Sequence, residues 1–89
     1  MKVSIIVVAH PDKTYTLSLA GLGDGAMPTT IGLPWDPLAA KLRGLFHFSQ
    51  ETLLAMKAES DNSGSAESGW FEASMEDLRA FGFRGLPNT

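Results

Sequence analysis

The feature that most constrains the fold is the apolar segment close to the start of the sequence. Residues Val3–Ala9 read Val-Ser-Ile-Ile-Val-Val-Ala, so both alternating faces of an extended segment carry apolar side chains. A strand that is apolar on both faces is typical of a buried, central position in a sheet. We therefore expect a strand over 3–9 with a neighbouring strand on each of its two edges.

The next segment, Thr14–Ala20, predicts the first of these neighbours. Its apolar side chains alternate with threonine and serine, which is the pattern of a strand with one face in water. Pro11 lies between the two segments and suits the second position of a type I turn, because its φ angle is already close to the required value. The sequence predicts a β-hairpin of these two strands, in which Val8 faces Tyr15.

A first helix is predicted over residues 36–45. Asp36 is followed by Pro37, and this pair is a strong helix start because the aspartate caps free backbone N–H groups while the proline loses nothing at the first helical position. Leucines then recur at helical spacing, and Gly44 is expected to end or weaken the helix.

Two further helices are predicted over 49–59 and 74–81. Ser49 and Ser74 are the expected caps, and acidic residues follow each of them in the first turn, where the helix dipole favours negative charge. The apolar pattern over 52–59 is short, so a hairpin strand is the alternative for that segment.

The remaining segments complete an α+β fold. Residues 60–69 are small and polar, have nothing to bury and are expected to form a mobile loop. Short strands at 29–33 and 70–73 are the two candidates for the second neighbour of the first strand. We predict one domain over 1–89, a small, mainly antiparallel sheet built on the N-terminal hairpin (3–9, 14–20) and packed against two or three short helices (36–45, 49–59, 74–81).

The amino-acid composition excludes several kinds of binding site and indicates where in the cell the protein is located. The sequence has no cysteine, which excludes disulfides, thiolate chemistry and cysteine-based metal sites. No apolar run approaches the roughly 20 residues of a membrane-spanning helix, and Pro11 interrupts the first apolar segment too early for a signal peptide. The net charge of −3 argues against direct binding of nucleic acid, which needs clustered lysine and arginine. We expect a cytoplasmic protein without cofactor, metal or membrane contact.

The turn Ala9-His10-Pro11-Asp12 resembles the opening of zinc-dependent sugar N-deacetylases, in which a strand ends in Ala-His-Pro-Asp-Asp-Glu. The resemblance implies a small metal-dependent hydrolase centred on His10 and Asp12, in which the histidine and the second aspartate of the motif hold zinc and the first aspartate is the base. This sequence departs from the motif at Lys13 and Thr14, which replace the second aspartate and the glutamate. A lysine at a ligand position would repel the ion. Such a hydrolase is the alternative function.

The same turn and the strand before it also resemble the first strand of flavodoxin-like quinone reductases. That family continues into a helix whose N-terminus holds phosphate. Here the next segment, Thr14–Ala20, has the alternation of a strand, so the resemblance covers only about ten residues and does not extend to the phosphate site.

Charge and aromatic side chains favour a binding function. Residues 51–77 hold seven acidic residues and one lysine. These acids suit helix starts and a solvated loop, and they also suit a surface that complements a basic groove. Tryptophan is enriched at the energetic centres of interfaces. The predicted partner-binding residues are Glu67, Trp70, Glu72, Glu76, Asp77 and Trp35.

These observations predict a non-enzymatic, protein-binding module whose partner is a protein with a basic surface. A concrete version is an inhibitor of phage or mobile-element type that covers a basic nucleic-acid-binding site on a host complex. Small acidic inhibitors of CRISPR effector complexes work this way as a class, and the analogy rests on size and charge. A homodimer that covers the first strand is a further alternative.

Overall fold

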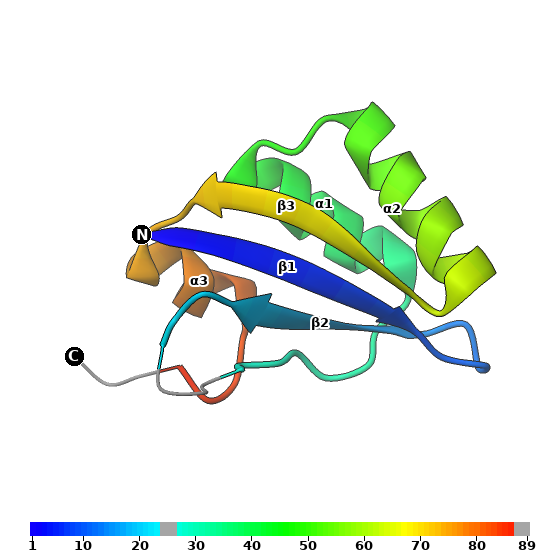
Figure 1. The fold of residues 1–89 in the computed structure, drawn as a ribbon, viewed down its shortest axis with the longest axis horizontal. Helices are drawn as coiled ribbons and strands as arrows, with labels where there is room; N and C mark the ends of the chain where they lie inside the picture. Colours follow the sequence, from blue (N-terminus) through cyan, green and yellow to red (C-terminus); the bar gives the residue numbers. More distant parts are fainter. Residues whose placement is uncertain (24–26, 87–89) are drawn as a thin grey trace.

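The computed structural model describes residues 1–23 and 27–86, and it has the predicted α+β architecture. The elements in chain order are β1 (Lys2–Ala9), β2 (Tyr15–Ala20), α1 (Trp35–Phe46), α2 (Gln50–Ser63), β3 (Ser65–Glu72) and α3 (Met75–Phe81). The strands form one antiparallel sheet in the order β2-β1-β3 (Figure 1). The central position of β1 confirms the prediction from its two-sided apolar pattern.

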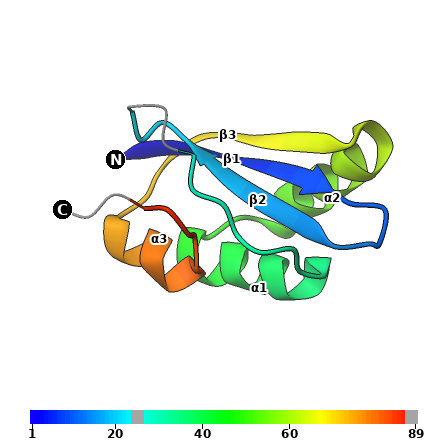
Figure 2. The ribbon, with the colours of Figure 1, turned by 90° about the horizontal axis from the view of Figure 1, so that it is seen from below.

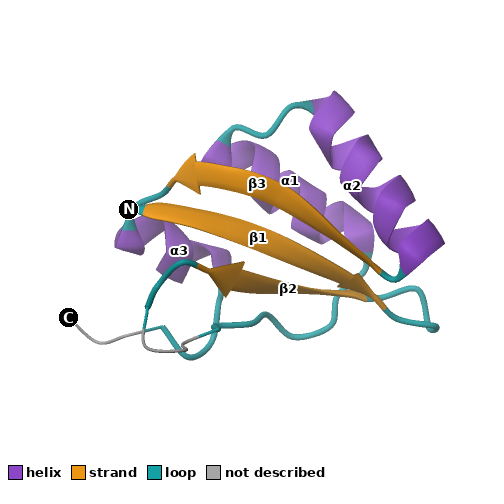
Figure 3. Cartoon of the chain, viewed as in Figure 1, coloured by secondary structure: helices purple, strands orange, loops and turns teal. Residues whose placement is uncertain are grey.

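The helices pack against one face of the sheet. Figure 2 shows α1 and α3 on the same side of the three strands, and Figure 3 shows the helices and the sheet in separate colours. Buried side chains from the strands and from all three helices fill the space between these layers, and they include Val3, Ile5, Val7, Leu17, Leu19, Leu38, Leu42, Leu53, Leu78 and Phe81. One face of the sheet therefore forms one side of the hydrophobic core.

The register of the hairpin differs from the prediction by one residue. Tyr15 pairs with Ala9 rather than with Val8. The shift arises at Lys13, which adds one residue to the turn and adopts the left-handed conformation with φ of +67°. The observed register places Tyr15 on the same buried face as Val7, whereas a slip of one residue would move every side chain of β2 to the other face.

The predicted strand 29–33 is not a continuous strand, and it does not neighbour β1. Thr29 and Leu33 form isolated bridges with Ser18 and Tyr15 of β2. The segment therefore lies along the outer edge of β2. Prolines at both of its ends remove backbone donors that a regular strand would need.

The predicted mobile loop 60–69 is instead the last turn of α2 and the first part of β3. Ser60 is fully buried, and Asp61 accepts a hydrogen bond from the hydroxyl of Tyr15 at 2.6 Å. These contacts with the sheet extend the helix beyond the predicted end at residue 59. The helix ends at Gly64, which has φ of +93°. Composition alone could not reveal contacts between residues so far apart in the chain.

The second neighbour of β1 is β3, which is longer than the strand predicted at 70–73. It spans eight residues, Ser65–Glu72, of which six pair directly with residues of β1. Ala66 is buried opposite Val7 and joins the core, whereas Ser65 and Gly69 of the same strand are exposed.

The predicted start of α1 is wrong in detail. The cap position is Pro34, which forms no side-chain cap hydrogen bond, and Asp36 lies in the first turn, where its charge still suits the helix dipole. Gly44 does not end the helix. The helix ends at His47, whose left-handed φ of +59° lets its N–H reach the carbonyl of Arg43.

The predicted caps of the other two helices are confirmed. Ser49 Oγ accepts a hydrogen bond from the N–H of Thr52 at 3.2 Å, and Ser74 Oγ accepts one from the N–H of Asp77 at 3.1 Å. The segment 52–59 is helical, so the alternative of a hairpin strand there is wrong.

Candidate functional site

One face of the sheet has no helix packed on it in the part of the chain that the structure describes, and we call it the open face. Its side chains come from alternate positions of the three strands, and they are Lys2, Ser4, Ile6, Val8, Thr16, Ser18, Ala20, Ser65, Glu67, Trp70 and Glu72. Ile6 and Val8 are partly exposed there, although their apolar character led to the expectation of burial. Trp70 is 64% exposed. The open face is thus mainly polar, with a partly exposed apolar pair, Ile6 and Val8, and an exposed indole ring.

Glu67 and Trp70 share the open face although they are three residues apart. Side chains alternate along a regular strand, so residues separated by three point to opposite faces. β3 contains a bulge in which two residues, Ser68–Gly69, stand opposite Ile5 of β1. Because the bulge adds one residue to β3, Glu67 and Trp70 both point to the open face. Bulges commonly redirect a side chain in this way next to functional sites.

Hydrogen bonds and a glycine hold this bulge. The backbone N–H of Ile5 donates to Ser68 Oγ at 2.9 Å, and that hydroxyl donates to the carbonyl of Gly69 at 2.8 Å. Gly69 has φ of +79°, a conformation that costs a residue with a side chain about 1–2 kcal/mol. The local sequence Glu-Ser-Gly-Trp therefore determines the direction of the indole ring.

The indole ring of Trp70 lies across β1 and reaches the residue that follows β2. A Cβ atom on Gly21 would lie 2.7 Å from Cζ3 of the ring and 2.8 Å from the carbonyl oxygen of Lys2. Ser4, which pairs with Trp70 on the intervening strand, is only 6% exposed although it belongs to the open face. One side of the indole is therefore seated on backbone and on Ser4, and the remainder faces water.

Carboxylates lie on both sides of Trp70 along β3. Glu67 is exposed and forms no ion pair among the residues that the structure describes. Glu72 is also exposed, and its carboxylate lies 3.1 Å from the N-terminal amine of Met1. Lys2 pairs with Glu72 across the strands. The charge of Glu72 is partly balanced, and Glu67 is the carboxylate that remains available to a ligand.

The other predicted acidic residues lie at the start of α3. Glu76 and Asp77 follow the cap Ser74 in the first turn. A hollow of about 410 Å³ at this end of the molecule is lined by both Glu72 and Asp77. The acidic residues thus extend from the open face around the end of the sheet instead of gathering on a single surface.

Trp35 does not belong to an exposed surface. It is 8% exposed, and its ring packs edge-to-face on Tyr15 with the centroids 5.2 Å apart. Trp35 lies just before the helix predicted over 36–45, but it is the first residue of α1 and is buried in the core. Of the two tryptophans, only Trp70 is exposed.

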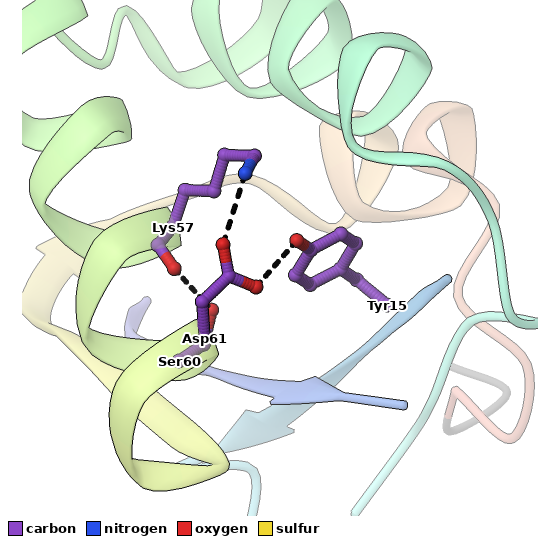
Figure 4. A network of polar contacts seen from close by, with 4 residues as sticks. All are labelled: Tyr15, Lys57, Ser60 and Asp61. Atoms are coloured by element: carbon purple, nitrogen blue, oxygen red, sulfur yellow. Dashed lines mark hydrogen bonds and ion pairs between the residues drawn. The ribbon is translucent and has the colours of Figure 1, made fainter. Parts of the chain in front are cut away.

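A polar network that the sequence did not predict joins α2 to the sheet (Figure 4). The hydroxyl of Tyr15 donates to Asp61 Oδ1 at 2.6 Å, and Lys57 Nζ donates to Asp61 Oδ2 at 2.9 Å. Ser60 Oγ donates to the carbonyl of Lys57 at 2.9 Å in the same turn of the helix. The spacing of Lys57 and Asp61, four residues apart, is the signal that could have extended the predicted helix.

The network shifts the pKa values of its members. The hydrogen bond from Tyr15 and then that from Lys57 lower the pKa of Asp61, and the hydrogen bond to Asp61 raises the pKa of Tyr15. The same carboxylate raises the pKa of Lys57. Each shift favours the protonation states that bind one another, so the network stabilises the contact between α2 and β2 at neutral pH.

A hollow of about 460 Å³ lies beside this network. It is lined by Lys13, Tyr15, Pro34, Trp35, Asp36, Lys57 and Asp61. Two lysines and two aspartates balance in charge, and the carboxylate of Asp61 is already bound by its neighbours. The hollow therefore offers a ligand no excess charge.

His10 and Asp12 are each engaged in local hydrogen bonds. Asp12 Oδ1 accepts from the hydroxyl of Thr14 at 2.6 Å and from its N–H at 3.1 Å, and these bonds lower the pKa of Asp12. His10 Nε2 lies 2.6 Å from Thr16 Oγ1. These contacts are those of a hydrogen-bonded turn.

The described residues contain neither a metal-binding cluster nor a membrane-spanning helix. Within residues 1–23 and 27–86, no three histidine, aspartate or glutamate side chains are grouped so that they could share a metal ion. None of the helices in that part of the chain has both the length and the apolar character needed to cross a membrane.

Comparison with known proteins gives no family. No protein-family model matches the chain, and no curated protein and no solved structure is detectably similar to it.

Proposed function

We propose that this chain is a non-enzymatic protein-binding module, and that the open face of the sheet is its binding surface. The observation that carries the proposal is the exposure of Trp70, which a β-bulge directs away from the core and which packs on Gly21. Exposed indole rings are common energetic centres of interfaces, because they bury a large apolar area and lose little conformational entropy. Ile6 and Val8 extend the apolar surface beside the ring.

The partner is a protein with a basic surface. Glu67 and Glu72 lie on the open face with Trp70, and Glu76 and Asp77 continue the negative charge onto α3. Such an arrangement speeds association with a positively charged surface and disfavours nucleic acid, whose phosphates it repels. Neither His10 nor Asp12 has an arrangement that favours the alternative, a metal-dependent hydrolase.

The concrete form of this function is an inhibitor of phage or mobile-element type, similar in class to the anti-CRISPR proteins. It would act in the cytoplasm and cover a basic nucleic-acid-binding site on a host protein complex. The small size, the net charge of −3 and the acidic residues on β3 and α3 support this form.

The experiment begins with site-specific cross-linking in the host cell. A photo-reactive amino acid replaces Val8 on the open face, and in the matched control it replaces Leu54, an exposed apolar residue of α2. A protein that is cross-linked from the first position and not from the second is purified. Its affinity for the chain is then measured over a series of salt concentrations and in competition with the nucleic acid that the partner binds.

The proposal expects an affinity that falls with rising salt and a partner that binds either the chain or its nucleic acid, but not both. Charge reversal at Glu67, Glu72, Glu76 and Asp77 should weaken binding at low salt. An affinity that ignores both salt and charge reversal would contradict a basic partner. Cross-links only between copies of the chain, with a dimer in gel filtration, would assign the open face to a homodimer instead.

A further inference from the structure

We propose that Trp70 and Glu67 recognise an arginine side chain of the partner. This inference rests on the proposed function, because it names the chemical group that the open face would bind. It assigns the indole as a stacking surface for the guanidinium plane and Glu67 as the carboxylate that receives its N–H groups.

The seating of Trp70 supplies the stacking surface. One side of the ring contacts Gly21 and covers Ser4, and the residue is nevertheless 64% exposed. A planar cation can therefore approach the ring from solvent without displacing any part of the protein. Cations bind most strongly to the face of tryptophan among the aromatic side chains, and guanidinium groups also stack on it as planes.

Glu67 supplies the charge. The bulge at Ser68–Gly69 keeps this carboxylate on the same face as Trp70, on the adjacent outward position of β3. Glu67 has no ion-pair partner in the described residues, whereas Glu72 is close to the N-terminal amine. A guanidinium group can donate two N–H groups to a carboxylate while its plane lies on the indole.

These features favour arginine over the other groups that stack on tryptophan. An ammonium group is compact and more strongly hydrated, and it cannot form the bidentate contact. A nucleobase would stack equally well, but Glu67 and Glu72 would repel the phosphates on either side of it. The carboxylates on the open face thus favour binding of a basic peptide over binding of a single-stranded nucleic acid.

The test uses the whole chain and three hexapeptides, made of arginine, of lysine and of citrulline, which has the shape of arginine without the charge. The indole N–H of Trp70 is followed by NMR at low ionic strength during each titration, and the Trp70→Phe variant assigns the signal. Hexaarginine should bind about fivefold more tightly than hexalysine, and hexacitrulline should bind more weakly still. A single-stranded oligothymidylate is titrated as the nucleic-acid arm.

Three variants locate the arginine site. Trp70→Leu keeps an apolar side chain but removes the ring, so its titrations are followed through the backbone amide signals of β3 instead of the indole N–H. Glu67→Gln removes the charge at nearly constant shape. Each should abolish the preference for arginine over lysine. Glu59→Gln removes one charge from an exposed position of α2 and is the matched control, which should leave the preference unchanged. Circular dichroism of each variant confirms that it is folded.

Equal affinities for arginine and lysine, an unchanged preference in Trp70→Leu, or tighter binding of the oligonucleotide would overturn the inference. A failure of the arginine assignment can be distinguished from a failure of the proposed protein-binding function. If the partner cross-linked from the open face loses its affinity for Trp70→Leu while the peptides show no arginine preference, the protein-binding face stands and the arginine assignment fails. If no protein is cross-linked, the proposed function fails independently of the peptide result.

Discussion

Trp70 and Gly21 touch across the central strand, although neither belongs to that strand. The position that a Cβ atom would take on Gly21 lies 2.7 Å from the indole ring, so only glycine leaves room for the ring to lie on the sheet. Gly21 also has φ of +102°, which an L-residue with a side chain adopts only at a cost. This contact fixes the orientation of the most exposed aromatic residue that the structure describes.

Replacement of Gly21 by alanine should therefore be more destabilising than the same change at Gly23. Both glycines have positive φ, but nothing lies within 4 Å of a Cβ atom on Gly23. We expect Gly23→Ala to lower the free energy of unfolding by about 1 kcal/mol and Gly21→Ala by about 2–3 kcal/mol, because a clash is added to the backbone strain. Urea denaturation measures both, and equal losses would show that the indole does not rest on Gly21.

The bulge predicts a specific role for the hydroxyl of Ser68. Ser68→Ala removes the acceptor of the Ile5 N–H, and an N–H without a partner at a buried residue costs about 1–2 kcal/mol. Ser65→Ala in the same strand is the control, because Ser65 is exposed, and it should change stability by less than about 0.5 kcal/mol. Chemical denaturation and amide exchange at Ile5 test this, and similar losses in the two variants would argue against it.

The hairpin turn contains strain that a substitution can remove. Lys13 has φ of +67°, a region that glycine enters without a steric penalty. Lys13→Gly should raise the free energy of unfolding by about 0.5–1 kcal/mol. Lys13→Ala also removes the lysine charge but keeps the backbone strain of the positive φ, so it should not raise it. Thermal and urea denaturation of both variants provide the measurement. A gain in Lys13→Ala equal to that in Lys13→Gly would assign the effect to charge.

The contact between Tyr15 and Asp61 should make stability depend on pH at both extremes. The pKa of Asp61 is lowered from its ordinary value of 3.8, so its contribution is present above that pH and is lost as the pH falls through the folded-state value. The pKa of Tyr15 is raised from 10.0, so its contribution is complete below that pH and is lost as the pH rises through the folded-state value.

The melting temperature of Tyr15→Phe tests this dependence. Its difference from that of the original chain should be constant from about pH 5 to pH 9 and should shrink outside that range. When Asp61 is replaced by asparagine, the effect of Tyr15→Phe on the melting temperature should largely disappear. When Glu59 on the same helix is replaced by glutamine, that effect should remain. A difference that is independent of pH would mean that the tyrosine hydroxyl acts without the carboxylate.

The sequence predicts much of this fold because several signals are local. The two-sided apolar pattern of 3–9 placed β1 at the centre of the sheet, and the caps Ser49 and Ser74 located two helix starts. The segment 60–69 was mistaken for a loop, because its helix and strand depend on contacts with Tyr15 and with β1, which composition does not record.

The candidate site was predictable only in part. Trp70 was named from its residue type, but its exposure depends on one extra residue in β3, and a bulge has no reliable signature in sequence. Trp35 has the same residue type and is buried, because it lies in the first turn of α1 and its ring packs on Tyr15. Residue type therefore indicates which side chains suit an interface, and backbone geometry decides which of them reach the surface.

The strand order has a consequence for folding in the cell. β1 obtains its first neighbour from the adjacent hairpin, but its second neighbour must return from the far part of the chain, where Glu72 pairs with Lys2. Closing so long a loop is entropically costly and slow. Until then the apolar segment Val3–Ala9 presents an unpaired edge to other nascent copies. Changes that delay the arrival of β3 should thus lower the yield through aggregation even where the folded protein is as stable as before.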